Sequence, residues 1–123
     1  MAKGRGSARS GVAAALVALL CLLVHSEIAS AATYTVGWMF NVVHWPDDKS
    51  FSAGDVLVFN YNPTSHNVVV VDSGGYNGCT ASSGAQVYQT GNDQITLTKG
   101  QNYFICSFEG HCENGMKIAV NAA

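Results

Sequence analysis

Short apolar runs separated by turn residues follow one another along most of this chain. The runs are rich in β-branched and aromatic residues, which favour extended strands. Gly, Pro, Asn, Asp and Ser occupy the intervening turns. The regular spacing predicts an all-β, Greek-key sandwich. One short helical turn is expected at residues 79–85, and no longer amphipathic helix is predicted. The expected strands lie at residues 34–36, 56–59, 68–71, 94–97, 103–105 and 118–120.

The beginning of the chain has the pattern of a secretory signal. Three basic residues precede an apolar run at residues 12–24, and small residues at 29–31 suit cleavage. The apolar run is about 13 residues, below the roughly 20 that a membrane-spanning helix needs, so a retained anchor is the weaker alternative. We therefore predict a signal peptide at residues 1–31, with its cleavage placed to within one residue, and one small domain at residues 32–123.

The composition of residues 32–123 excludes some functions. Three lysines stand against seven carboxylates, a net charge of −4 with histidines neutral, and every arginine precedes residue 32. This balance disfavours nucleic-acid binding. No hydrophobic tail ends the chain, so a GPI anchor is not expected. These features predict a secreted, soluble protein that prefers cationic partners to anionic ones.

A loop after the run 103–105 contains the residues with the most informative chemistry. Cys106, His111 and Met116 are spaced five residues apart. Five-residue steps would point the side chains in different directions on a helix, whereas a loop allows them to converge. A thiolate, an imidazole and a weak axial thioether are ligands of a blue-copper site, which needs one further histidine. His66 is the candidate, because loops distant in sequence meet at one end of a Greek-key sandwich.

Each of these residues also has an ordinary structural interpretation. Cys106 alone would usually be a disulfide partner, His66 a turn or surface histidine, and Met116 a core residue. Their joint pattern favours the metal site. His44 has no sulfur or second imidazole nearby in the sequence, and we interpret it as a surface histidine.

Three cysteines follow the predicted signal, namely Cys79, Cys106 and Cys112. An odd number in an oxidising compartment leaves one thiol for another task. Three pairings are possible. A bridge between Cys79 and Cys112 is favoured because it leaves Cys106 free and would brace the loop beside His111.

Together these segments resemble the phytocyanins, and the likeness covers nearly all of residues 32–123. A departure lies at residues 35–41, which are shorter than the glycine-rich stretch usual in the family, so their conformation is left open. The segments that carry the resemblance are FSAGD at 51–55, FNYNP at 59–63, SHNVVVV at 65–71, KGQNYFIC at 99–106 and GHCENGMKIAVN at 110–121.

The resemblance implies an extracellular plant cupredoxin with one type 1 copper ion. It implies the ligand set His66, Cys106, His111 and Met116, and a disulfide between Cys79 and Cys112. Met116 distinguishes the chain from the stellacyanin-like branch, in which glutamine takes the axial position.

The function expected from these observations is single-electron transport by Cu(II)/Cu(I) cycling. The alternative is an extracellular signalling or cell-wall interaction protein in which copper is structural or incidental. An enzyme is disfavoured, because a full ligand set leaves no open metal position and no nucleophile–base pair is evident. We expect a monomer whose partner, a redox protein or a cell-wall component, the sequence does not identify.

Overall fold

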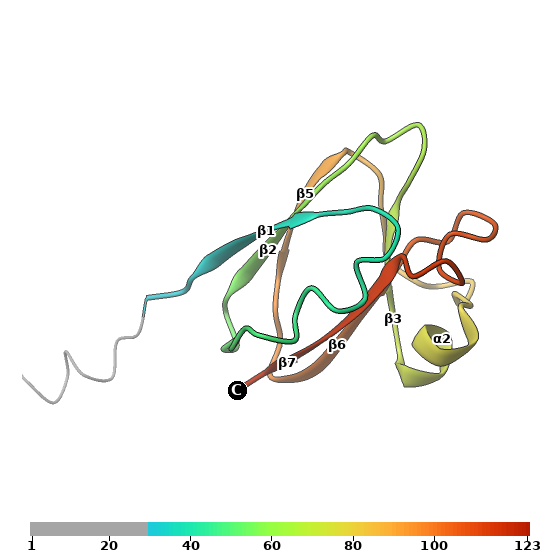
Figure 1. Cartoon of the computed structure of the whole chain (residues 1–123). Helices are drawn as coiled ribbons and strands as arrows, with labels where there is room; N and C mark the ends of the chain where they lie inside the picture. The colour runs from blue at the N-terminus through green and yellow to red at the C-terminus, as the bar shows by residue number, and fades with distance from the viewer. Residues whose placement is uncertain (1–29) are drawn as a thin grey trace, which may run out of the picture. The chain divides into compact units, whose positions relative to one another are not determined.

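Two β-sheets lie face to face and enclose the apolar runs of the sequence (Figure 1). The computed structural model describes residues 30–123, and nearly all of the predicted signal peptide lies outside the described residues. One sheet has the order β1-β2-β5 and the other the order β4-β3-β6-β7. The elements are β1 (Thr33–Gly37), β2 (Val56–Asn60), β3 (Val68–Val71), α2 (Ser73–Gly78), β4 (Val87–Tyr88), β5 (Asn92–Thr96), β6 (Gly100–Ile105) and β7 (Lys117–Ala122).

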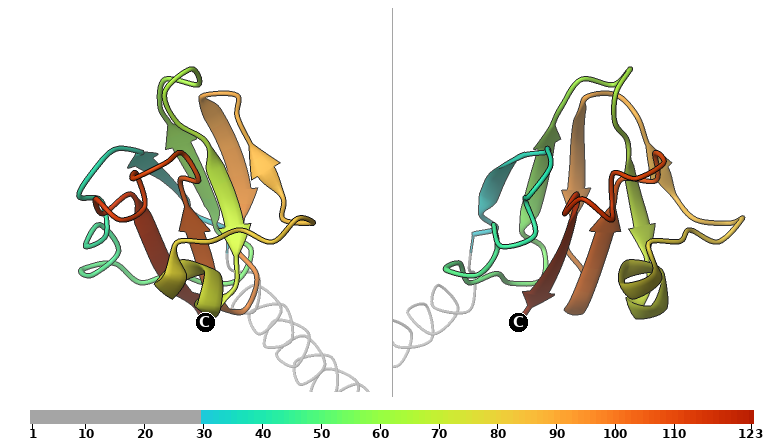
Figure 2. Two further views of the ribbon diagram at one scale, coloured as in Figure 1. Left: turned by 90° about the vertical axis from the view of Figure 1, so that its right-hand side faces the viewer. Right: turned by 45° about the vertical axis from the view of Figure 1, so that its right-hand side comes forward.

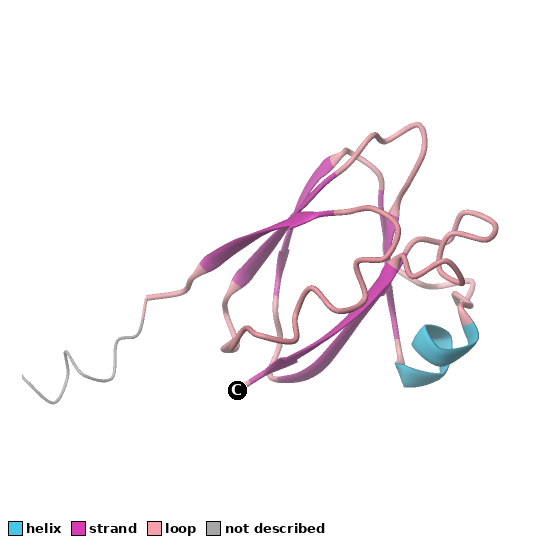
Figure 3. Ribbon diagram, viewed as in Figure 1, coloured by secondary structure: helices cyan, strands magenta, loops and turns pink. Residues whose placement is uncertain are grey.

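Alternation of inward and outward side chains produces the core between the sheets. On β2, Leu57 and Phe59 are fully buried, and their neighbours along the strand are less so. On the facing sheet, Phe104 of β6 packs against Phe59 with ring centroids 5.1 Å apart. The regular structure of the described residues consists mostly of strands, as Figure 3 shows, which confirms the predicted all-β sandwich.

The helix begins earlier than the sequence analysis predicted. A short helical turn was expected at residues 79–85, but α2 spans Ser73–Gly78. The Asp72 side chain caps it by accepting a hydrogen bond from the backbone N–H of Gly75. Cys79 ends it in the left-handed conformation, with φ 52°. The prediction was wrong because residues 72–75 have turn composition, and the N-cap hydrogen bond outweighs the poor helix propensity of the three glycines in α2.

The first strand pairs in a way that the sequence did not predict. β1 runs parallel to β2, with Thr33 opposite Val56, so the chain crosses from one strand to the other through residues 38–55. The shortened segment at residues 35–41 therefore contains the end of β1 and the turn after it. That turn reaches the loop between β6 and β7, because Asn41 N–H donates to the Asn114 carbonyl at 3.3 Å.

A half-buried tyrosine joins the two sheets at the end of β2. Tyr61 O–H is hydrogen-bonded to the Asp93 carboxylate on β5 and to the Tyr88 carbonyl on β4. Burial first, and then the hydrogen bond to Asp93, raise the pKa of Tyr61 to about 12. Asp93 also accepts from the Thr90 hydroxyl. These bonds hold the ends of both sheets in a fixed relation.

Candidate metal centre

Strand pairing brings His66 and Cys106 to the same end of the sandwich. β3 and β6 are antiparallel neighbours, with Val69 opposite Ile105. His66 lies just before β3, and Cys106 directly follows β6. The start of one strand therefore lies beside the end of the other. The pairing of β3 with β6 therefore brings together two residues that are 40 positions apart in the sequence.

The loop between β6 and β7 folds back on itself and places His111 against the same point. Cys106 N–H donates to the Met116 carbonyl at 3.0 Å, and Met116 N–H donates to the His111 carbonyl at 3.1 Å. Gly115 adopts φ +85°, and a Cβ there would lie 3.1 Å from the Cα of Asn41. Glycine permits both this dihedral angle and this close approach. In Figure 2 the loop (red) lies beside the turn after β1 (cyan).

Three potential ligand atoms converge where these loops meet. One atom each from His66, Cys106 and His111 lie within 4.8 Å of one another. The two histidine Nδ1 atoms are 3.0 Å apart, and Cys106 Sγ is 3.4 Å from His111 Nδ1. Cys106 is fully buried, whereas both histidines are half-buried. Met116, the fourth residue predicted for the site, is fully buried in the same core cluster as Cys106.

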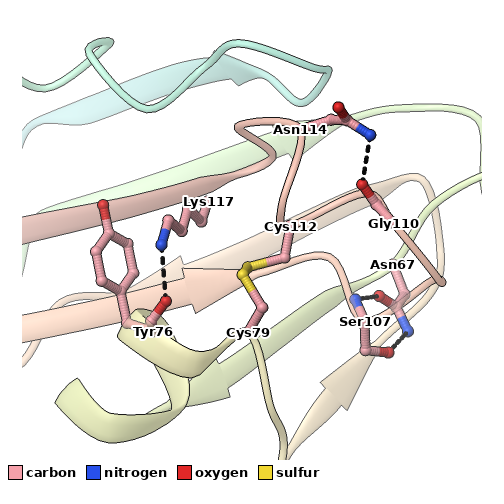
Figure 4. Close-up of a disulfide and its surroundings, with 8 residues drawn as sticks. All are labelled: Asn67, Tyr76, Cys79, Ser107, Gly110, Cys112, Asn114 and Lys117. Carbon is pink, nitrogen blue, oxygen red and sulfur yellow. Dashed lines mark hydrogen bonds between the residues drawn. A yellow bond between two sulfur atoms is a disulfide. The ribbon is translucent and has the colours of Figure 1, made fainter.

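Asn67 connects the two segments that supply the site. Its side-chain oxygen accepts from Ser107 N–H, and its side-chain nitrogen donates to the Ser107 hydroxyl, both at 2.8 Å (Figure 4). The Trp38 indole N–H donates to the Asn67 backbone carbonyl at 2.8 Å. Asn67 is nearly fully buried, so these bonds satisfy polar groups that water does not reach. They fix the separation between the segments of His66 and Cys106.

The disulfide lies directly beside His111 in the sequence. Cys79 and Cys112 are bridged with Cα atoms 5.6 Å apart, and Cys106 is a free thiol. This confirms the predicted pairing. Figure 4 shows how the bridge joins the end of α2 to the loop, with Lys117 Nζ donating to the Tyr76 carbonyl at 2.9 Å nearby. The loop is therefore held from outside as well as by its own backbone bonds.

Aromatic rings cover the histidines on the solvent side. Phe40 packs edge-on against His66 and His111, at centroid distances of 5.7 and 4.8 Å. Phe108 lies 5.6 Å from the His111 ring. Sequence analysis missed Phe40 and the bridging role of Asn67. Phe40 has no local signal, since its position depends on the turn after β1.

His44, interpreted as a surface residue, is exposed and pairs with Asp47 at 2.9 Å.

The pKa of His66 lies below its ordinary value of 6.5. Burial of the ring is the larger cause, and the charge of His111 is the smaller one. The folded protein therefore takes up a proton at His66 less readily than the unfolded chain. Below about pH 6.5 the unfolded chain therefore binds more protons than the folded protein. The free energy of unfolding is highest above about pH 6.5 and falls as the pH drops below that value. We expect the metal-free protein to show a lower urea midpoint at pH 5 than at pH 7. In a His66→Gln variant this difference should shrink, and an unchanged difference would contradict the role of His66.

The site combines a buried thiol, two imidazoles and a buried thioether at one end of an all-β sandwich. This combination defines a small metal protein of the cupredoxin class. The chain belongs to the family of plastocyanin-like domains, which matches residues 34–116. The phytocyanin resemblance is thereby confirmed, together with its blue-copper character.

Individual relatives agree with this assignment. A protein named basic blue protein from Arabidopsis thaliana is 60% identical over 99% of both chains. The solved structure of cucumber basic protein, described as a blue copper protein, is 59% identical over 75% of this chain and 100% of its own, with a TM-score of 0.74. Spinach plantacyanin is 56% identical over the same shares, with a TM-score of 0.70. The first two of these names describe a blue protein and a blue copper protein, and none of the three names describes an enzyme.

Proposed function

We propose that this protein binds one copper ion and carries single electrons. The observation that supports the proposal most strongly is the convergence of the Cys106 thiol with two imidazole nitrogens, all within 4.8 Å, in a chain of the blue-copper family. Copper, when bound, supplies a reversible one-electron couple. The domain proposed to do this comprises residues 32–123.

The donor set fits copper in its chemistry. Cys106 would supply the soft thiolate, and His66 and His111 would supply imidazole nitrogens through Nδ1, the atoms that face one another at 3.0 Å. Met116 would supply the weak axial thioether, a ligand that tunes the reduction potential. Because Cys106 is fully buried, its thiolate would be shielded from solvent and from other oxidants.

The surrounding structure would keep these side chains in place when the charge at the site changes. Asn67 joins the segments of His66 and Cys106, and the disulfide of Cys112 holds the position next to His111. A site that moves little between two oxidation states exchanges electrons with a small reorganisation cost. The half-buried His111 ring, between Phe40 and Phe108, is the proposed exit for the electron.

We further propose that the protein is secreted, with residues 1–31 as the signal peptide, and acts as a monomer with an extracellular redox partner or a cell-wall component. The Cys79–Cys112 disulfide is consistent with an oxidising compartment. No helix among residues 30–123 is long and apolar enough to cross a membrane.

Voltammetry of the copper-loaded protein tests this function. We expect one reversible one-electron wave whose size matches the bound copper. A protein that binds copper but gives no reversible wave would contradict electron transport and would favour the interaction role described above.

Met116→Gln tests the axial assignment. We expect the blue colour to persist and the reduction potential to fall, because an oxygen donor favours Cu(II) over Cu(I) more than a thioether does. Met39→Gln replaces an exposed methionine that is not in the proposed ligand set; it is the matched control and should leave the potential unchanged. If Met116→Gln leaves the potential unchanged or raises it, Met116 acts as a core residue only.

A further inference from the structure

A groove lies on one open side of the sandwich, away from the proposed copper ligands. β4 is the outer strand of one sheet and β5 is an outer strand of the other. The hollow between them has a volume of about 400 Å³, within the range of about 300–1,000 Å³ that is usual for small-ligand sites. Its floor is apolar and is formed by Val70, Ile95 and Phe104. We call this hollow the β4–β5 groove, with walls that include Gln86, Tyr88, Gln94 and Thr96.

Two side chains on the β4 wall have hydrogen-bonding groups that the fold does not use. The Gln86 amide and the Tyr88 hydroxyl form no hydrogen bond with another residue among 30–123. Gln86 is exposed, and Tyr88 is half-buried with its ring packed against the core. Asn102, which also lines the groove, differs because its side chain is bonded to the backbone of Thr98 and Gly100. Gln86 and Tyr88 are therefore the groups on this side that can bind a ligand.

The opposite wall provides backbone groups at a free strand edge. Leu97 N–H donates to the Asp55 carbonyl at 2.8 Å, so Leu97 and alternate residues before it direct their peptide groups toward β2. The N–H and C=O groups of Gln94 and Thr96 point the other way. On that side β5 pairs with no other strand of residues 30–123. These unpaired groups can donate and accept hydrogen bonds from a molecule in the groove.

The groove carries no charge, which restricts what it can bind. None of the nine residues that line it is ionisable at neutral pH, although residues 32–123 contain three lysines and seven carboxylates. An ion placed there would lose water without gaining a charged partner. A sugar, in contrast, has hydroxyls at its edges and C–H groups on its faces. Hydroxyls suit the free amide, phenol and peptide groups, and C–H groups suit the face of an aromatic ring.

We propose that the β4–β5 groove binds a neutral oligosaccharide built of pyranose sugars. The Gln86 amide and the Tyr88 hydroxyl bind sugar hydroxyls from one wall, and the peptide groups of Gln94 and Thr96 bind them from the other. The apolar floor and the Tyr88 ring contact the C–H faces. None of the proposed copper ligands lines the groove, so the copper end of the sandwich stays accessible when a saccharide is bound. The proposal does not depend on electron transport.

An extended peptide is the competing occupant, because a free strand edge can also add a strand. Such a peptide would pair with the Gln94 and Thr96 backbone. It would not need the Gln86 amide or the Tyr88 hydroxyl on the other wall. Unused polar groups on both walls therefore favour the saccharide.

Amide NMR spectra of the ¹⁵N-labelled protein, recorded with and without Cu(I), test the proposal during addition of cellohexaose, mannohexaose or xylohexaose. We expect at least one of these neutral probes to shift the N–H signals of Gln86, Tyr88, Gln94 and Thr96 until the site is saturated. Hexagalacturonate has the same length but a carboxylate on each sugar, and it should bind at least about tenfold more weakly. No saturable shift with any neutral probe, shifts confined to other residues, or equal binding of hexagalacturonate would overturn the proposal.

Matched variants test the residues on the β4 wall. Gln86→Ala should weaken binding of the responding saccharide about fivefold and Tyr88→Phe about threefold, because each loses a hydrogen bond. The controls are Gln101→Ala and Tyr103→Phe, which alter an exposed glutamine and a half-buried tyrosine of β6 outside the groove. They should change the affinity by less than about 1.5-fold.

Equal effects from the variants and the controls, or no effect from Gln86→Ala and Tyr88→Phe, would remove the saccharide from this groove. An uncharged hexapeptide of alternating threonine and valine tests the competing occupant in the same spectra. If the peptide shifts the Gln94 and Thr96 signals and the saccharides do not, the groove accepts a peptide strand and the proposal is wrong. Electron transport would be unaffected by any of these results.

Discussion

Replacing Cys106 with serine is expected to abolish the intense visible band of the copper-loaded protein. The band arises from charge transfer between a thiolate sulfur and Cu(II), and a hydroxyl does not supply this donor. Serine has nearly the same size, so the fully buried position should remain filled and the sandwich should still fold. Visible absorption with one equivalent of Cu(II) measures the first effect, and circular dichroism of the metal-free variant measures the second.

Cys79→Ser is the matched control for colour, since it also exchanges sulfur for oxygen but at a residue outside the proposed ligand set. It should keep the band when the protein is folded. Full colour in Cys106→Ser would remove Cys106 from the site. Loss of colour in both variants would mean that the loop, rather than the thiolate, determines the spectrum.

Cys79→Ser should also cause the largest loss of stability. The bridge closes a sequence separation of 33 residues in a small domain. Removing such a bridge typically lowers the free energy of unfolding by about 2–5 kcal/mol, largely because the unfolded chain gains freedom. Urea denaturation of the metal-free protein measures this loss.

The double variant Cys79→Ser with Cys112→Ser controls for the unpaired thiol and should show a similar loss. A change below about 1 kcal/mol in both variants would contradict a stabilising bridge. Peptide mapping under non-reducing conditions checks the pairing directly. A Cys79–Cys106 link in the copper-loaded protein would contradict both the disulfide and the thiolate assignment, because a sulfur in a disulfide is not a thiolate.

Six of the seven strands of the described domain were predictable because each has a local signature. Runs such as 56–59 and 68–71 combine β-branched and aromatic residues with turn residues on both sides. The short edge strand β4 was missed, since Val87–Tyr88 is only two residues long and its neighbours are polar. The parallel pairing of β1 with β2 was also missed. It depends on a crossover through residues 38–55, for which no local pattern exists.

The candidate ligands were predictable for a different reason. The spacing of Cys106, His111 and Met116 is visible in the sequence, and the three cysteines after residue 31 leave one thiol unpaired. The contacts of Phe40 and Asn67 at the site were not predictable, because they depend on which strands and loops are neighbours in the fold. Phe40 reaches the histidines because the turn after β1 contacts the β6–β7 loop, and Asn67 reaches Ser107 because β3 and β6 are neighbours. Such contacts follow from strand order, which a single sequence specifies only indirectly.

The visible spectrum of the purified, metal-free domain of residues 32–123 during addition of Cu(II) is the sharpest test of the proposed copper site. We expect an intense blue band that grows until one copper ion is bound per chain and then stops. A spectrum with only the weak absorption of copper bound to nitrogen and oxygen, or with no saturable band at all, would contradict a copper centre formed by Cys106, His66, His111 and Met116.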